Sequence, residues 1–203
     1  MFINKKPFFG GNMKRLFLLL FFMIGTLVAQ DYVGAAKCKA CHNSESKGAQ
    51  FSKWEATRHA NSFETLKSEK AAEIAAKKGL KVPAYEAAEC VACHTTGFGK
   101  GGYEIKDAAF WAEVTDKGKP TSDVKRMESL QNVGCEVCHG PGSEYKSSKV
   151  MKGLADGSVD AASVGYTVPS EKTCTGCHNE KSPTFKGFNF KEYLPKVAHP
   201  RPE

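Results

Sequence analysis

Four copies of one short motif contain every cysteine of the chain. In each copy two residues separate a pair of cysteines, and a histidine directly follows the second cysteine. The copies begin at Cys38, Cys90, Cys135 and Cys174. Zinc knuckles also use paired cysteines but do not require that adjacent histidine. A thioredoxin-like redox motif would occur once, within a βαβ pattern. The repeated pattern is instead typical of covalent c-type haem attachment.

The chemistry of attachment explains the spacing. On one helical turn, two thiols can form thioethers with the two vinyl groups of a single haem, and the next side chain can bring its imidazole to the iron. We therefore predict four covalently attached c-type haems. The predicted thioether residues are Cys38, Cys41, Cys90, Cys93, Cys135, Cys138, Cys174 and Cys177. The predicted proximal iron ligands are His42, His94, His139 and His178.

Two further histidines, His59 and His199, are candidates for the opposite side of an iron. His59 shares a predicted helical face with Phe51 and Trp54, as expected of a helix that packs on a porphyrin. His199 follows an apolar segment that can dock the end of the chain. We predict that both are distal ligands rather than core or surface histidines.

Two methionines beyond the first 30 residues complete the set of possible ligands. Met151 lies 12 residues after motif three, on a helix predicted to begin at Ser143, and is the stronger candidate. Met127 is the weaker one because charged neighbours are expected to keep it in water. For both, filling a gap in the core is the common alternative role. If neither binds, an iron stays open to small molecules.

The N-terminal 29 residues have the composition of a signal peptide. They contain four basic residues, no acidic residue and an apolar run over 16–28. A run of about 13 residues suits a signal peptide and is short for a membrane span. Met13 is an alternative start, and an uncleaved anchor is the alternative to cleavage near Ala29. The predicted location is the periplasm or the cell exterior.

The charge of the chain does not indicate a nucleic-acid partner. The net charge is +7, but residues 30–203 carry 25 basic against 22 acidic side chains. Each oxidised haem adds a charge of about −1 through its propionates, which brings the loaded protein close to neutral. We therefore predict redox proteins as partners, no nucleic acid, and membrane contact only through an uncleaved signal or a membrane-bound redox partner.

The positioning elements are predicted to be mainly helical with extensive loops and little or no sheet. The motif starts are separated by 52, 45 and 39 residues, which is too irregular for a repeat array. We expect one compact tetrahaem domain over 30–203. Helices are predicted over 48–66, 68–79, 121–130, 143–151 and 189–200, with a glycine-rich loop over 96–107.

Longer stretches surround the four motifs. They read YVGAAKCKACH, KWEATRHA, CHTTGFG, VGCEVCHGPGSEY and CTGCHNEKSPTFKGFNF, with KVAHP near the end. These stretches resemble the tetrahaem cytochrome c-554 family. The resemblance implies a helical fold with closely stacked haem pairs, mostly bis-histidine ligation and a role as electron carrier. It also implies that His59 and His199 are distal ligands, and that one haem can lack a distal protein ligand.

One departure from the family limits what the resemblance implies. Many relatives have a histidine shortly after the Gly-Pro-Gly-Ser segment, where this chain has Glu144, Tyr145 and Lys146. Either Met151 replaces that ligand or a haem is open. The predicted function is a non-enzymatic electron carrier, as the resemblance implies. The alternatives are a reductase of NO, nitrite or hydroxylamine at a five-coordinate haem, and a subunit of an oligomer, extracellular filament or larger complex.

Overall fold

The computed structural model describes residues 30–199, and these residues are mainly helical. No β-strand occurs among them, and the only bridges are two isolated pairs, Thr95 with Gln131 and Val114 with Pro120. The predicted fold class is therefore confirmed. The signal-peptide prediction for 1–29 lies outside the described residues. Within 30–199, no helix has the length and apolar character needed to cross a membrane.

Short helices joined by loops make up the described chain. The α-helices are α2 (Ala36–His42), α3 (Gln50–Glu55), α4 (Ser62–Thr65), α5 (Glu69–Lys77), α6 (Ala88–His94), α7 (Ala108–Trp111), α8 (Ser122–Leu130), α9 (Cys135–His139), α10 (Ser148–Asp156), α11 (Glu171–Thr175) and α12 (Phe190–Tyr193). The 3-10 helices are η2 (Glu45–Lys47), η3 (Arg58–Asn61), η4 (Ala84–Glu86), η5 (Ala162–Val164) and η6 (Leu194–Lys196).

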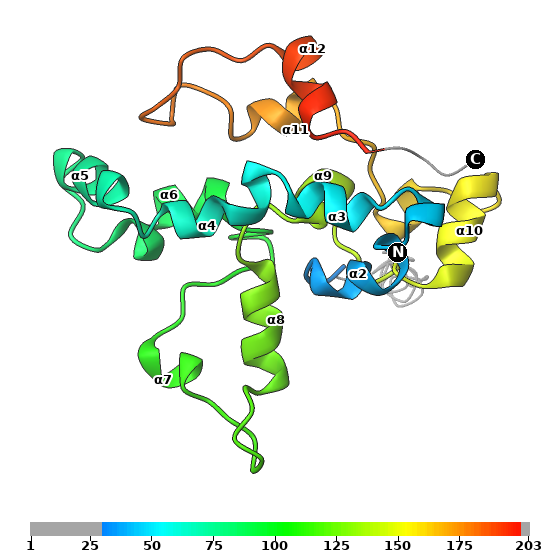
Figure 1. Cartoon of the computed structure of the whole chain (residues 1–203), viewed down its shortest axis with the longest axis horizontal. Coiled ribbons are helices and arrows are strands. Elements are labelled where there is room, and N and C mark those ends of the chain that lie inside the picture. Colours follow the sequence, from blue (N-terminus) through cyan, green and yellow to red (C-terminus); the bar gives the residue numbers. More distant parts are fainter. Residues whose placement is uncertain (1–29, 200–203) are drawn as a thin grey trace, which may run out of the picture.

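The helices form a central row with projections on either side (Figure 1). The row contains α5, α6, α4, α9 and α3, and α2 and α10 lie at one end of it. The arm formed by α7 and α8 extends from one side of the row, and α11 and α12 lie on the other side. The four cysteine motifs therefore belong to separate short helices spread along and above the row.

The apolar core is small and lies where α8 meets the row. Its members are Phe63, Leu66, Ala71, Ala75, Ala84, Val91, Tyr103, Met127 and Leu130. Helix α8 contributes one buried face, on which Val124 and Leu130 are almost completely covered. Thr121 caps this helix because its hydroxyl accepts a hydrogen bond from the Val124 N–H at 3.3 Å.

The helix predicted over 48–66 is broken into α3, η3 and α4, so the predicted continuous helical face is wrong. The helix ends after Glu55, and Thr57 is extended. The Thr57 hydroxyl donates to the Trp54 carbonyl at 2.7 Å, a local bond that competes with helix continuation. Tertiary bonds then fix the break, because the Trp54 indole donates to the Val133 carbonyl and the Val133 N–H donates to the His59 carbonyl.

The other predicted helices differ in how well their limits agree with the structure. Helices α5 and α8 lie within the predicted ranges, and Gly79 follows α5 with a positive φ of 71°. The helix that carries Met151 begins later than predicted. Ser147, not Ser143, caps α10 by accepting the Val150 N–H. Ser143 instead binds Asp31 through its main-chain N–H.

Candidate haem sites

Each of the four motifs lies on a turn of helix, as covalent attachment requires. Motifs one and two form the C-terminal parts of α2 and α6, and motif three is the whole of α9. Helix α11 ends at Thr175, before the second cysteine of motif four. A main-chain bond of 2.9 Å from the His178 N–H to the Cys174 carbonyl nevertheless preserves the helical turn. All four motifs therefore have the geometry that two thioethers and a following imidazole need.

The cysteines of different motifs approach one another in pairs. The thiols of Cys38 and Cys135 share a hydrogen bond, which raises the pKa of Cys38 and lowers that of Cys135. A second hydrogen bond, between the thiols of Cys93 and Cys177, lowers the pKa of Cys93 to about 6. Motif three is also close to motif four. The pKa of Cys138 in motif three is raised first by burial and second by the charge of Cys174 in motif four. The spatial order of the motifs is one, three, four, two.

Three of the motif histidines are oriented through their Nδ1 atoms. The His94 Nδ1 lies 2.6 Å from the Ser62 carbonyl, and the His139 Nδ1 lies 3.1 Å from the Thr167 carbonyl. The His42 Nδ1 lies 3.3 Å from the Gln50 side-chain oxygen. Since a carbonyl oxygen can only accept, each Nδ1 carries the proton and each Nε2 presents its lone pair. This is the usual arrangement around a metal-binding histidine.

The fourth motif histidine is positioned by stacking instead. The ring of His178 lies 4.8 Å from that of Phe188, with an angle of 19° between their planes. Phe188 in turn stacks on Tyr193 of α12 at 5.4 Å. Helix α12 thus packs next to motif four, and Figure 1 shows it beside α11. Together, the two cysteines on one helical turn of each motif and the positioned imidazole that follows them fit a covalently bound haem.

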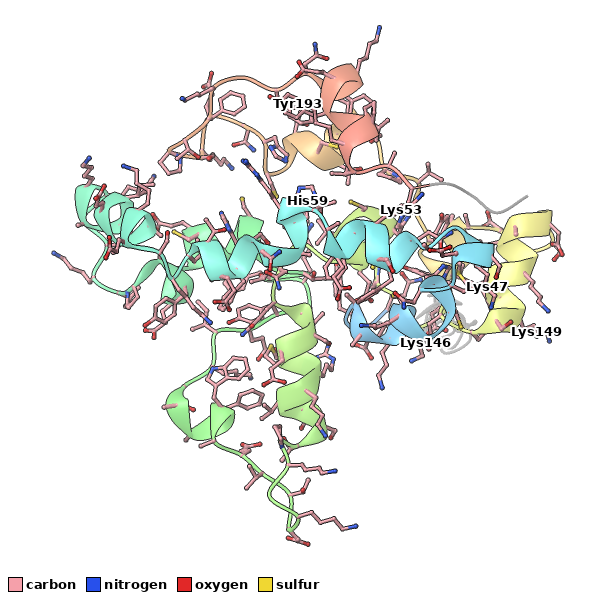
Figure 2. All side chains as sticks on the ribbon, in the orientation of Figure 1. Lys47, Lys53, His59, Lys146, Lys149 and Tyr193 are labelled. Atoms are coloured by element: carbon pink, nitrogen blue, oxygen red, sulfur yellow. The ribbon has the colours of Figure 1, made fainter. Side chains whose placement is uncertain are left out.

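Each of the two histidines outside the motifs approaches a motif histidine. The ring centres of His59 and His178 are 6.0 Å apart, and those of His139 and His199 are 5.8 Å apart. Two imidazoles on opposite sides of one metal ion, each bonded at about 2 Å, have ring centres about 6 Å apart. Figure 2 shows His59 on the side of the central row that faces α11 and α12.

Burial favours the neutral form of two of these rings. It lowers the pKa of His59, and the charge of His178 lowers it further. Burial also lowers the pKa of His139, which the bond to Thr167 partly opposes. A neutral imidazole is the form that binds a metal. The two pairs use four of the six histidines of the chain and leave His42 and His94 outside them.

The two methionines lie in different surroundings. Met127 is 4% exposed, belongs to the apolar core and accepts the Glu104 N–H through its sulfur at 3.1 Å. The expectation that charged neighbours keep it in water is wrong, because α8 turns its charged residues outward and Met127 inward. Met151 is half-buried on α10. Figure 1 places this helix at the same end of the row as α2.

Sequence reasoning missed several residues that position the motifs. Gln50 and Thr167 orient motif histidines, and Ser62 does so through its carbonyl oxygen. Main-chain carbonyls carry no sequence signal, so Ser62 and Thr167 could not have been found. Glu136, between the cysteines of motif three, is 2% exposed. The sequence carried no signal for this burial, because acidic residues are almost never fully buried and a glutamate in a short polar motif is expected to face solvent.

Comparisons with known proteins agree with this geometry. A family model described as cytochrome c554 and c-prime matches residues 37–140. Cytochrome c-554 of Nitrosomonas europaea is 32% identical over 188 residues, which cover 85% of this chain and 70% of that protein. The chain belongs to the cytochrome c-554 family. The solved structure of reduced cytochrome c554 from the same organism matches with a TM-score of 0.50 and 28% identity, over 83% of this chain and 78% of that one.

Membership in the cytochrome c-554 family confirms the predicted family and the coarse function. The protein is a multihaem c-type cytochrome, its haem is covalently bound, and its role is electron transfer. This chain has Glu144, Tyr145 and Lys146 after its Gly-Pro-Gly-Ser segment, where the resemblance led us to expect a histidine, so Met151 stays a candidate ligand.

Proposed function

We propose that this cytochrome is exported, binds four haems and passes single electrons between partner redox proteins. The observation that carries the proposal is the continuous spatial series of four attachment motifs, each with two cysteines and a histidine on one helical turn. When bound, each haem supplies an iron that cycles between the ferrous and ferric states. The protein holds the irons close together and sets their potentials through ligands and surroundings.

The proposed ligand set follows from the ring contacts. His42, His94, His139 and His178 are the proximal ligands of haems one to four. The 6.0 Å contact supports His59 as the ligand opposite His178, and the 5.8 Å contact supports His199 as the ligand opposite His139. The proton on Nδ1 of His139, held by Thr167, fixes the tautomer that leaves Nε2 for the iron.

We propose Met151 as the distal ligand of the haem at motif one. Helix α10 lies at the same end of the molecule as α2, which supports this pairing (Figure 1). Met127 is not proposed because its sulfur is buried in the core and already accepts a hydrogen bond. His94 is then the proximal ligand of a haem with no distal protein ligand.

A second candidate function, reduction of a small nitrogen compound, is favoured by one observation near motif two. A cavity of about 280 Å³ separates α5 from a later loop and is lined by Lys70, Ile74, Lys77, Lys78, Pro183 and Thr184. Lys78 also lies close to Cys90 of motif two, where its charge partly offsets the rise in thiol pKa caused by burial. A basic cavity beside an open iron is suited to an anion such as nitrite.

Two measurements test the proposed function. Mass spectrometry of the exported protein is expected to give the mass of the processed chain plus four haems, and three or fewer in fully matured protein would contradict the proposal. Mixing the reduced protein with nitrite or NO then separates the two functions. Slow reoxidation without turnover supports the carrier, and catalytic consumption of either compound supports the reductase.

A further inference from the structure

A buried acidic side chain lies inside motif three, and neither haem attachment nor ligation accounts for it. Glu136 occupies the position after Cys135 and is 2% exposed. It is the one buried charged residue among residues 30–199. Burying a carboxylate is costly unless every oxygen finds a partner. Its retention at this point therefore calls for a physical explanation.

Three main-chain donors surround the carboxylate. One oxygen accepts the Val33 N–H at 2.8 Å and the Gly142 N–H at 2.6 Å, and the other accepts the Gly34 N–H at 2.7 Å. Glu136 is in none of the ion pairs formed by the described residues. A protonated carboxyl group would need an acceptor for its own hydrogen, whereas these three partners are all donors. The three donors therefore match the ionised form of the carboxylate, which only accepts hydrogen bonds.

The backbone around the carboxylate is specialised for this close approach. Gly34 has a φ of +88°, and a Cβ there would lie 1.8 Å from the Ser129 hydroxyl. A Cβ on Gly142 would lie 2.9 Å from a Glu136 oxygen. Larger residues at either glycine would push a donor away. Val33 and Gly34 lead directly into α2, so the carboxylate also fastens the segment before motif one to motif three.

The negative charge acts on its neighbours. Burial raises the pKa of Tyr32 and of Tyr145, and the charge of Glu136 is the second cause in both cases. The same charge makes a smaller contribution to the raised pKa of Cys38 and opposes the lowered pKa of Cys135. These two cysteines are the proposed attachment points of haems one and three. The carboxylate is therefore close to both attachment points.

We propose that Glu136 is a fixed negative charge that lowers the reduction potentials of the haems attached at motifs one and three. The inference rests on the proposed haem attachment at Cys38 and Cys135. Reduction adds an electron to an iron, and a nearby carboxylate without a cationic partner disfavours that addition in a medium of low dielectric constant. The three N–H donors hold the charge in place, so Glu136 is a positioning and tuning residue and not an iron ligand.

The test is a potentiometric titration of the four-haem protein carrying Glu136→Gln. At the potential where the affected haems of the wild type are half reduced, the variant is expected to show a reduced-to-oxidised ratio about tenfold higher. This ratio corresponds to an upward shift of about 59 mV for a one-electron couple. Two of the four components should move and two should stay. The matched control is Glu144→Gln, which removes the same charge from an exposed position of the neighbouring loop.

Further variants separate electrostatics from structure. Glu136→Ala removes the charge and leaves space for water at the three donors, so its potentials should rise as in Glu136→Gln. Glu136→Asp keeps the charge with poorer hydrogen bonds, so it should lose stability but keep low potentials. Unshifted potentials in both neutral variants overturn the proposal, as does a shift in Glu136→Asp equal to that in Glu136→Gln. Failure of both neutral variants to mature, while Glu136→Asp matures, also overturns it in favour of a purely structural role. Haem mass measured on every variant shows separately whether the proposed attachment itself is wrong.

Discussion

At the scale of single residues, covalent chemistry makes haem attachment readable from sequence. Two thioethers and a proximal imidazole on one helical turn require a fixed spacing, and this spacing does not depend on the rest of the fold. The pairing of ligands is different. His59 and His178 are 119 residues apart in the chain, and only the fold brings their rings to 6.0 Å. The sequence could therefore nominate His59 as a ligand but could not assign it to motif four.

The proposed pairing predicts a change of spin state when one distal imidazole is removed. His59→Ala and His199→Ala should each convert one of the four proposed haems from low spin to high spin. The iron loses one axial ligand, while the thioethers still hold the haem. Electron paramagnetic resonance and visible spectra of the oxidised protein measure this change, and mass spectrometry should still give four haems.

Arg58→Ala provides the matched control for His59→Ala. Arg58 is the exposed neighbour in the same 3-10 helix, so its removal should leave the spectrum unchanged. Wild-type spectra in both histidine variants would refute the ligand assignment. A change in haem count in either variant would instead indicate that the histidine is needed for maturation.

At the scale of elements, prediction succeeded where local signals agreed and failed where distant contacts intervened. Helix α5 combines good helix formers with the Ser68 cap and a following glycine, so its range follows from the sequence. The 48–66 segment has helical periodicity but contains Thr57, whose hydroxyl takes a helix carbonyl. Its break is then fixed by bonds to Val133, which no local pattern reveals.

Helix α10 supplies the next prediction, because its limits determine where Met151 lies. The cap at Ser147 places Met151 in the first turn after the cap, at the end of the molecule that carries α2. If its thioether binds the iron at motif one, the oxidised protein shows the near-infrared charge-transfer band of a histidine–methionine haem. Met151→Leu should abolish the band and lower the potential of that haem, since thioether ligation favours ferrous iron.

Met127→Leu is the matched control, since it removes the other thioether and nearly preserves the volume of a core side chain. That variant should keep the band. Absence of the band in the wild type, together with rapid CO binding at two haems, would contradict methionine ligation. It would also strengthen the reductase over the carrier.

At the scale of the whole molecule, the described chain buries little apolar surface of its own. Fourteen hydrophobic side chains are buried within residues 30–199, and five of them are alanines. Burying a methylene group contributes about 0.8 kcal/mol, so alanines add little to the driving force for folding. Ordering each residue costs about 1–2 kcal/mol of conformational entropy. Four macrocycles between the helices would supply the apolar surface that the side chains lack.

The polypeptide without haem is therefore expected not to fold. Residues 30–203 produced without the proposed export segment, in cells that do not attach haem, should show weak helical circular dichroism and no cooperative thermal transition. The exported holoprotein with the same mature sequence is the control and should unfold cooperatively. Without haem and its iron ligation, the described part of the chain has only short α-helices of four to nine residues. Helices of this length are marginal in water by themselves. A cooperative transition in the haem-free chain would show that the small core around α8 suffices for folding, and that the haems fill the structure without creating it.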